Sequence, residues 1–211
     1  MIITYLGGEF LKIQFGDVVL ALNPPSRDSK LKSSRFGADI ALSTLNHPDF
    51  NGIESVSHGD HRPFAIVGPG EYEIKGIVIR GFVTQSQYGG KTRINTVYTI
   101  LLEGMKLCFL GALTSPELPP ALKEELDELD ILFVPVGTEG VLSPAAANKL
   151  AVTLEPRLII PMHYAGLGGE QVLKQFLKEA GEEKSPVQEK LTIKKKDLEG
   201  KEGEVAVLTA A

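Results

Sequence analysis

The chain has 211 residues, of which 43% are hydrophobic and 23% charged, and this balance is typical of a folded domain. The length predicts a single domain over residues 1–211. The formal net charge of -5 gives no overall attraction to a phosphate backbone, so a nucleic-acid partner is not expected. With Cys108 as the only cysteine, no internal disulfide can form, which suits a reducing compartment.

We also find neither the pattern of a membrane helix nor that of a signal peptide in the sequence. No window approaches the roughly 18 apolar residues of a membrane helix, and no basic flank precedes a long apolar stretch near Met1, as it would in a signal peptide. We therefore expect a cytoplasmic protein that does not enter a membrane.

The first half of the chain has the pattern of short β-strands. Runs of β-branched, aliphatic and aromatic residues predict strands over 2–6, 10–15, 18–22, 38–44, 62–68, 70–85 and 92–103. Gly16-Asp17 is a plausible tight turn between the second and third of these. Asn23-Pro24-Pro25 ends the third strand, because proline lacks the amide donor, and a polar loop follows to about Gly37. A bend is expected at Gly76.

The second half alternates between strands and helices. Strands are predicted over 105–110, 130–136 and 157–164, and helices after Pro116, from Ser143-Pro144 and over 169–180. Ser143 is a good N-cap and Pro144 fits the first helical turn. Segments 191–196 and 204–209 are predicted as a closing pair of strands. This order predicts an α/β (α+β) fold with two mixed β-sheets flanked by helices.

A small group of metal-ligand residue types lies after two predicted strands. The chain has only four histidines, at positions 47, 58, 61 and 163, and catalytic zinc commonly takes three protein ligands and a water. His47 and Asp49 follow the strand over 38–44, whereas His163 ends the strand over 157–164, so these three side chains can converge at one sheet edge. His58 and His61 lie in a polar loop, where we expect them to be solvated.

The order of segments resembles the metallo-β-lactamase superfamily, in particular its small bacterial, lactonase-like branch of zinc-dependent hydrolases. The resemblance covers nearly the whole chain and is carried by the residues at 4–7, 38–40, 45–50, 68–76, 130–137 and 160–164. It implies an αββα sandwich with the site at one edge.

The chain departs from the metal-binding signature of that family. The family has a His-x-His-x-Asp-His motif, a mid-chain histidine, a Gly-Asp carboxylate that bridges two metals, and a late histidine. Here His47 and Asp49 remain in the motif and His163 matches the late histidine. Leu45 and Phe50 occupy the outer histidine places, Ala112 follows Gly111 in place of the bridging aspartate, and the mid-chain place falls on Thr84–Ser86. Leucine, phenylalanine and alanine have no lone pair to donate to a metal.

Two interpretations of the surviving residues stay open. In the first, His47 and Asp49 cap or bond nearby backbone, and His163 is a satisfied histidine at a strand end. In the second, His47, Asp49 and His163 hold a single zinc or iron, because two histidines and a carboxylate are a known ligand set for both metals. Asp49 would then be the candidate catalytic residue. Leu45, Phe50 and Ala112 are expected to line or fill what is left of the site.

Two functions follow from these interpretations. The first is a non-catalytic member of the fold, a pseudoenzyme with a degenerate metal site and no cofactor, which binds a small molecule or a protein and forms homo-oligomers or other assemblies. The alternative is a weak single-metal hydrolase of an ester, lactone or phosphoester.

Overall fold

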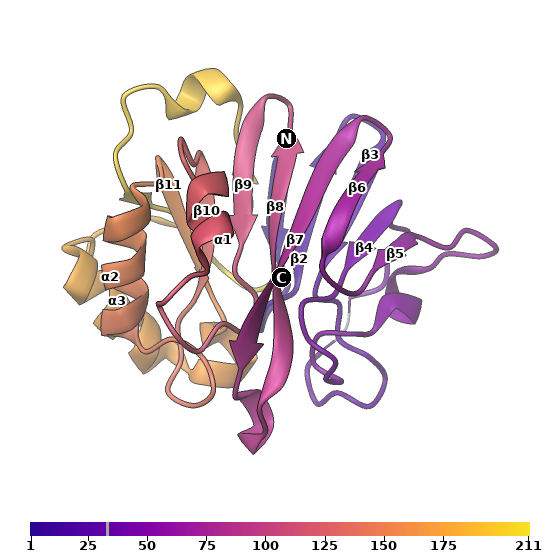
Figure 1. The fold of residues 1–211 in the computed structure, drawn as a ribbon, viewed down its shortest axis with the longest axis horizontal. Coiled ribbons are helices and arrows are strands. Elements are labelled where there is room, and N and C mark those ends of the chain that lie inside the picture. The colour runs from indigo at the N-terminus through magenta and orange to yellow at the C-terminus, as the bar shows by residue number, and fades with distance from the viewer. Residues whose placement is uncertain (33) are drawn as a thin grey trace.

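The computed structural model describes residues 1–32 and 34–211, so Ser33 of the predicted polar loop lies outside the described residues. The chain forms two large β-sheets that face each other (Figure 1). The first sheet has the order β13 (Leu191–Thr192), β1 (Ile2–Tyr5), β2 (Leu11–Phe15), β3 (Val18–Leu22), β4 (Ile40–Leu42) and β5 (Phe64–Ile66). The second has the order β14 (Glu204–Val205), β11 (Leu158–Met162), β10 (Ile131–Pro135), β9 (Met105–Phe109), β8 (Arg93–Leu102), β7 (Ile77–Ser86) and β6 (Gly70–Ile74).

Both sheets are mixed. In the first sheet, β1, β2 and β3 form an antiparallel meander, whereas β4 and β5 run parallel to β3. In the second, β6 to β9 are antiparallel, and β9, β10, β11 and β14 are parallel. These sheets confirm the predicted α/β class with two mixed sheets.

One hydrophobic core joins the two sheets. Along each strand, alternate residues point into the space between the sheets, so that Ile40 and Leu42 of β4 share a cluster with Ile79 of β7 and Ile100 of β8. On the outer face of the first sheet, Ala41 of β4 belongs to a smaller cluster with Phe10 and other residues. Alternate side chains along the strands thus hold the two sheets of the sandwich together.

The helices cover the second sheet. α1 (Pro120–Glu125), α2 (Pro144–Leu154) and α3 (Glu170–Ala180) lie on its side of the molecule (Figure 1). Ser143 caps α2 as predicted, since its side chain accepts a hydrogen bond from the amide of Ala146. The outer face of the first sheet is covered by the long segment between β3 and β5, which includes the 3-10 helix η1 (Ile53–Val56). Within the described part of the chain, no helix is long and apolar enough to span a membrane.

The end of the chain differs from the prediction. Segments 191–196 and 204–209 do not pair with each other: β13 joins β1, β14 joins β11, and β15 (Val207–Leu208) joins β12 (Val187–Gln188). The end of the first segment is a 3-10 helix over Lys195–Leu198 instead of a strand. The prediction of a closing pair was wrong because both segments found partners distant in sequence, which a local pattern does not reveal.

Candidate functional site

Two loops bring the predicted site residues to one edge of the sandwich. His47 and Asp49 follow β4 in the first sheet, and His163 follows β11 in the second. His163 has a left-handed backbone with φ 76, an uncommon conformation for a residue other than glycine. Its amide donates to the carbonyl of Gly8, so the loop after β1 fixes the direction in which the chain leaves β11.

Asp49 has hydrogen-bond partners on both carboxylate oxygens. The Ser29 hydroxyl donates to Oδ1, and the Tyr88 hydroxyl donates to Oδ2 at 2.7 Å. The amide of Asp49 donates to His47 Nδ1 at 3.2 Å, while Nδ1 lies 3.4 Å from Asp49 Oδ2. His47 therefore bonds nearby backbone, in agreement with the first interpretation of these residues.

His163 is tied to a buried polar network instead. Its Nδ1 lies 2.9 Å from Oε1 of Glu9, a fully buried carboxylate. Asn23 Nδ2 donates to the other oxygen of Glu9 at 3.0 Å and to Thr44 Oγ1 at 2.9 Å. The Thr44 amide donates to Asn23 Oδ1 at 2.8 Å. This network links the ends of β1, β3, β4 and β11, and it leaves only Nε2 of His163 without a described partner.

The ring of Tyr88 lies among all these residues. Its centroid is 4.9 Å from that of His47, 5.5 Å from that of His163 and 4.9 Å from that of Phe50, with steep edge-on angles in each case. Edge-to-face packing at such distances is favourable for aromatic rings. Tyr88 begins the short 3-10 helix η2 (Tyr88–Gly90) at the tip of the β7–β8 hairpin. The hairpin therefore places an aromatic ring in the site.

The position of that ring is set by its backbone. The Tyr88 carbonyl accepts from Arg93 Nη1 at 2.6 Å, and the Tyr88 amide donates to Ser86 Oγ at 3.1 Å. On the other side, a Cβ at Gly140 would lie only 2.5 Å from the Tyr88 Cα, so this loop passes directly against the backbone. Tyr88 is therefore a fixed part of the site.

Apolar side chains fill the positions that the sequence comparison aligned with family ligands. Leu45, Phe50 and Ala112 are buried and form one cluster with Val141, against which Tyr88 packs. This agrees with the expectation that they fill the site. Thr44 packs so closely against Gly111 that a Cβ at this position would lie 2.5 Å from Thr44 Oγ1. A larger residue than glycine would therefore clash here.

The mid-chain place also carries no metal donor of the family type. Thr84 Oγ1 donates to the carbonyl of Asn95 at 3.0 Å and accepts from Asn95 Nδ2 at 2.9 Å. Ser86 is buried and accepts from Tyr88 as described above, whereas Gln85 points to the exposed side. Asn95 Oδ1 is buried without a hydrogen-bond partner in the described chain.

The ionisation of the site follows from burial. Burial lowers the pKa of His47, and the charge of Arg93 acts in the same direction, while Asp49 opposes them. Burial raises the pKa of Tyr88 well above 10, and the hydrogen bond to Asp49 raises it further. Near neutral pH, Tyr88 therefore stays protonated and donates a hydrogen bond to Asp49, and Nδ1 of neutral His47 accepts a hydrogen bond from the Asp49 amide.

This arrangement does not fit the zinc or iron that the fold family implies. A metal needs three or more donors directed at one point, and among residues 1–32 and 34–211 no three His, Cys, Asp or Glu side chains are so disposed. Asp49 already accepts from Ser29 and Tyr88, and the Tyr88 ring lies against both His47 and His163. His58 and His61 lie in an exposed loop, as expected.

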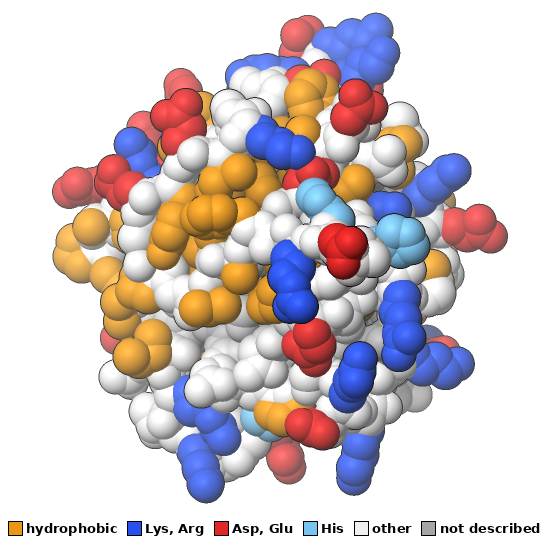
Figure 2. Space-filling model, turned by 90° about the vertical axis from the view of Figure 1, so that its right-hand side faces the viewer, with side chains coloured by type: hydrophobic (Ala, Val, Ile, Leu, Met, Phe, Trp, Pro, Cys, Tyr) orange, Lys and Arg blue, Asp and Glu red, His pale blue; other side chains and the backbone are white. Residues whose placement is uncertain are grey.

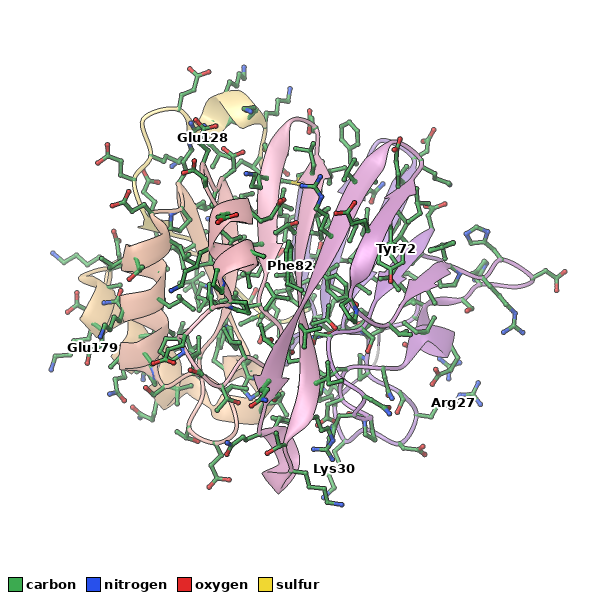
Figure 3. All side chains as sticks on the ribbon, viewed as in Figure 1. Arg27, Lys30, Tyr72, Phe82, Glu128 and Glu179 are labelled. Atoms are coloured by element: carbon green, nitrogen blue, oxygen red, sulfur yellow. The ribbon has the colours of Figure 1, made fainter. Side chains whose placement is uncertain are left out.

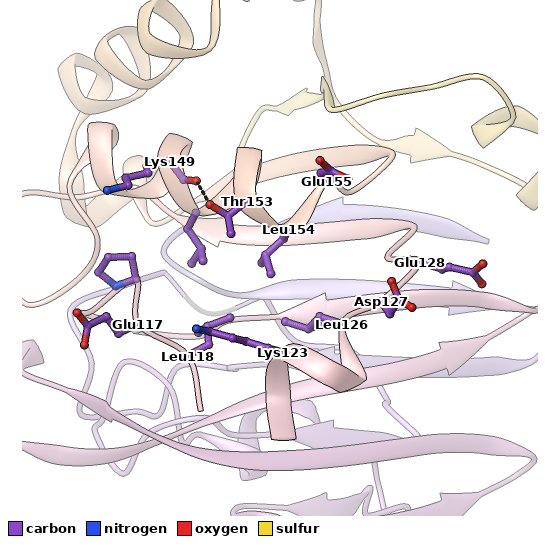
Figure 4. Close-up of a pocket in the computed structure, with 12 residues that line it drawn as sticks. Glu117, Leu118, Lys123, Leu126, Asp127, Glu128, Lys149, Thr153, Leu154 and Glu155 are labelled. Atoms are coloured by element: carbon purple, nitrogen blue, oxygen red, sulfur yellow. Dashed lines mark hydrogen bonds between the residues drawn. The ribbon is translucent and has the colours of Figure 1, made fainter. Parts of the chain in front are cut away.

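A cavity of about 480 Å³ lies outside the ring. Its lining includes His47, Asp49, Tyr88, Lys30, Leu31 and Leu167, but not His163. Figure 3 shows Lys30 beside the tip of the β7–β8 hairpin. Two larger hollows lie elsewhere: one of about 660 Å³ between α1 and α2 (Figure 4), and one of about 840 Å³ beside the ends of α2 and α3. They share no residue with the site.

The sequence did not point to Tyr88 or Glu9. Tyr88 lies in a glycine-containing turn between two predicted strands, and Glu9 is a single acidic residue between Gly8 and Phe10. An acidic residue within an otherwise apolar segment was the one available signal for Glu9, because a buried carboxylate requires a partner.

The fold and the order of its segments define the class of protein. A sequence profile described as "Beta-lactamase superfamily domain" matches residues 2–163, and the chain belongs to this superfamily. A metal-dependent hydrolase of Listeria innocua is 26% identical over 197 residues, which are 78% of this chain and 85% of the relative. A UPF0173 protein of Pyrococcus furiosus is 31% identical over 112 residues, 52% of this chain and 48% of the relative, so the match spans about half of that protein.

A solved structure extends the similarity to the whole fold. A Thermotoga maritima protein, assigned as a Zn-dependent hydrolase of the metallo-beta-lactamase superfamily, matches with a TM-score of 0.73 and 27% identity over 99% of both chains. The recognition of this superfamily from the sequence is thereby confirmed. The relatives named above include both a bacterial and an archaeal protein.

Proposed function

We propose that this chain is a non-catalytic member of the metallo-β-lactamase fold, with a binding or assembly role in the cytoplasm. The observation that carries the proposal is the position of Tyr88. Its ring packs against His47 and His163, and its hydroxyl bonds Asp49. All three surviving donors of the family signature are thus engaged with one aromatic side chain, whose backbone is held on both sides.

The apolar substitutions support the same proposal. Leu45, Phe50 and Ala112 offer no lone pair, and they pack together beside the ring. Two-metal hydrolases use a hydroxide held between their metals as nucleophile. A chain with these residues has no obvious source of that nucleophile.

The second candidate is a weak hydrolase that holds a single zinc or iron on His47, Asp49 and His163. It is favoured by the Listeria innocua relative, which is named a metal-dependent hydrolase, and by the presence of all three residues around one ring. This function would require Tyr88 to leave its place and Asp49 to exchange its hydrogen bonds for a metal. The substrate would be an ester, lactone or phosphoester, with Asp49 as the candidate catalytic residue.

Metal content distinguishes the two candidates. Protein purified without added metal is expected to contain well under one zinc or iron per chain by inductively coupled plasma mass spectrometry. It should show no chelator-sensitive hydrolysis of generic lactone or phosphodiester substrates. Stoichiometric metal that disappears in the His163→Ala variant would contradict the non-catalytic function and support the hydrolase.

A repaired variant provides the matched control. Combining Leu45→His, Phe50→His and Ala112→Asp with Tyr88→Gly restores three family donors and removes the ring. We expect this variant, in preparations that circular dichroism shows to be folded, to take up more metal than the unmodified chain, because it offers three more of the family's donors. The same assay thereby shows that it can detect metal in this fold.

A further inference from the structure

The outermost strand of the second sheet has a free edge. β6 pairs with β7 on one side, and in the described part of the chain no strand pairs with its other side. Only three residues, 67–69, lie between β5, the last strand of the first sheet, and β6. Both edges lie on the same side of the molecule (Figure 1). An unpaired edge presents backbone donors and acceptors to a further strand.

The turn after β6 determines which backbone groups point outward. Lys75 and Gly76 form a two-residue turn with positive φ at both positions, 54 and 75, as in a type I′ hairpin. In such a hairpin the flanking pair Ile74–Ile77 is hydrogen-bonded, and the pairs alternate along the ladder. The non-bonded pairs are then Glu73–Val78 and Glu71–Arg80. The outward amides and carbonyls of β6 therefore belong to Glu71 and Glu73.

The inner side of this edge is apolar. Tyr72 and Ile74 pair with core residues of β7 and face the space between the sheets, and Figure 3 shows Tyr72 on this edge. On the facing sheet, Phe64 is 51% exposed, and Val67 in the connection is 68% exposed. Figure 2, which views this side of the molecule, shows hydrophobic side chains gathered into a patch. A strand added to β6 would lie beside these exposed side chains and cover them with its own apolar residues.

The outer side of the same edge is acidic. The side chains of Glu71 and Glu73 are exposed, and that of Glu71 retains 80% of its accessible surface. Arg80 Nε lies 3.7 Å from Glu71, but Arg80 Nη1 is bonded to Glu125 at 2.7 Å. Two copies of β6 paired in antiparallel order about Tyr72 would place Glu71 opposite Glu73 twice, and like charges directly opposite are destabilising. A second copy of this edge is therefore a poor partner.

We propose that the β6 edge binds an extended segment of another protein in which apolar residues alternate with lysine or arginine. The apolar residues would lie beside Tyr72 and Ile74 and next to exposed Phe64, and the basic residues beside Glu71 and Glu73. Main-chain hydrogen bonds to the two glutamates would hold the segment, as in other cases of β-strand addition. The proposal rests on the binding role proposed above but not on the state of the metal site.

The test uses the full chain and three synthetic peptides. One eight-residue peptide alternates isoleucine and lysine, the second alternates isoleucine and glutamate, and the third has the composition of the first with the lysines grouped together. Titration into ¹⁵N-labelled protein should give amide shifts over 70–74 for the first peptide alone. The double variant Glu71→Lys, Glu73→Lys should reverse the preference between the first two peptides, with a change in affinity on the order of tenfold or more from two cross-strand pairs.

A second pair of variants separates strand addition from simple charge attraction. Glu73→Pro removes the outward amide without touching the β6–β7 ladder, because proline is tolerated on the free side of an edge strand, whereas Glu73→Gln keeps that amide. Binding that is lost in the proline variant and only weakened in the glutamine variant supports the proposal. Equal binding of all three peptides, or shifts spread away from 70–74, overturns it. Metal content is measured separately, so a failed peptide titration leaves the test of the non-catalytic function intact.

Discussion

Truncating Phe50 to alanine should destabilise the protein strongly. The Phe50 side chain is 0% exposed, packs with Leu45, Ala112 and Val141, and has its ring centroid 4.9 Å from that of Tyr88. Removing a well-packed buried phenylalanine costs about 3–5 kcal/mol. For a chain of this size, about 1 kcal/mol corresponds to roughly 2–4 °C in Tm. We therefore expect Tm to fall on the order of 10 °C.

Urea unfolding followed by far-ultraviolet circular dichroism measures this free energy, and a thermal scan measures Tm. Phe64→Ala is the matched control, because it removes the same atoms from a side chain that is 51% exposed and should cost well below the Phe50 variant. A loss under about 1 kcal/mol for Phe50→Ala, or equal losses for the two variants, would refute the view that Phe50 is a well-packed part of the candidate site.

Three further predictions concern the polar contacts of the site. Tyr88→Phe keeps the ring and removes the hydrogen bond to Asp49, so it should lower the unfolding free energy by about 1–2 kcal/mol, measured by urea unfolding. Glu9→Ala leaves His163 Nδ1 and Asn23 Nδ2 without the carboxylate they contact and should cost roughly 1–3 kcal/mol for each buried group left unpaired; a neutral result would show that the network is dispensable. Because burial lowers the pKa of His47 in the folded state below 6.5, the unfolded chain binds this proton more tightly. Stability should therefore fall as the pH drops through about 6.5, and His47→Gln should reduce that slope.

Much of the fold was predictable because its strands follow local patterns. The runs of β-branched, aliphatic and aromatic residues in β2 and β3, the Gly16-Asp17 turn and the Ser143 cap depend on residues close together in sequence. The segments after Leu191 depend on partners distant in sequence, β1 and β11, and their pairing could not be read from their own composition.

The candidate site was predictable in its positions but not in its contacts. The strand ends correctly suggested that His47 and His163 lie at one edge, and apolar residues at 45, 50 and 112 suggested a filled site. The central position of Tyr88 depends on the length and direction of the β7–β8 hairpin and on loops from three other parts of the chain. The residues near Tyr88 in sequence do not indicate where the tip of the hairpin lies in the folded structure.

The aromatic contact between the hairpin tip and the two loops should reduce local opening at this edge of the molecule. Loops that bind ligands are commonly among the least stable parts of a protein and exchange their amide hydrogens quickly. Here Tyr88 joins the loop after β4 to the loop after β11 through packing and a hydrogen bond. The amides of Asp49 and His163 should then exchange slowly, at rates closer to those of the core strands. Tyr88 would in this way connect the two sheets of the sandwich at an edge where loops usually move independently.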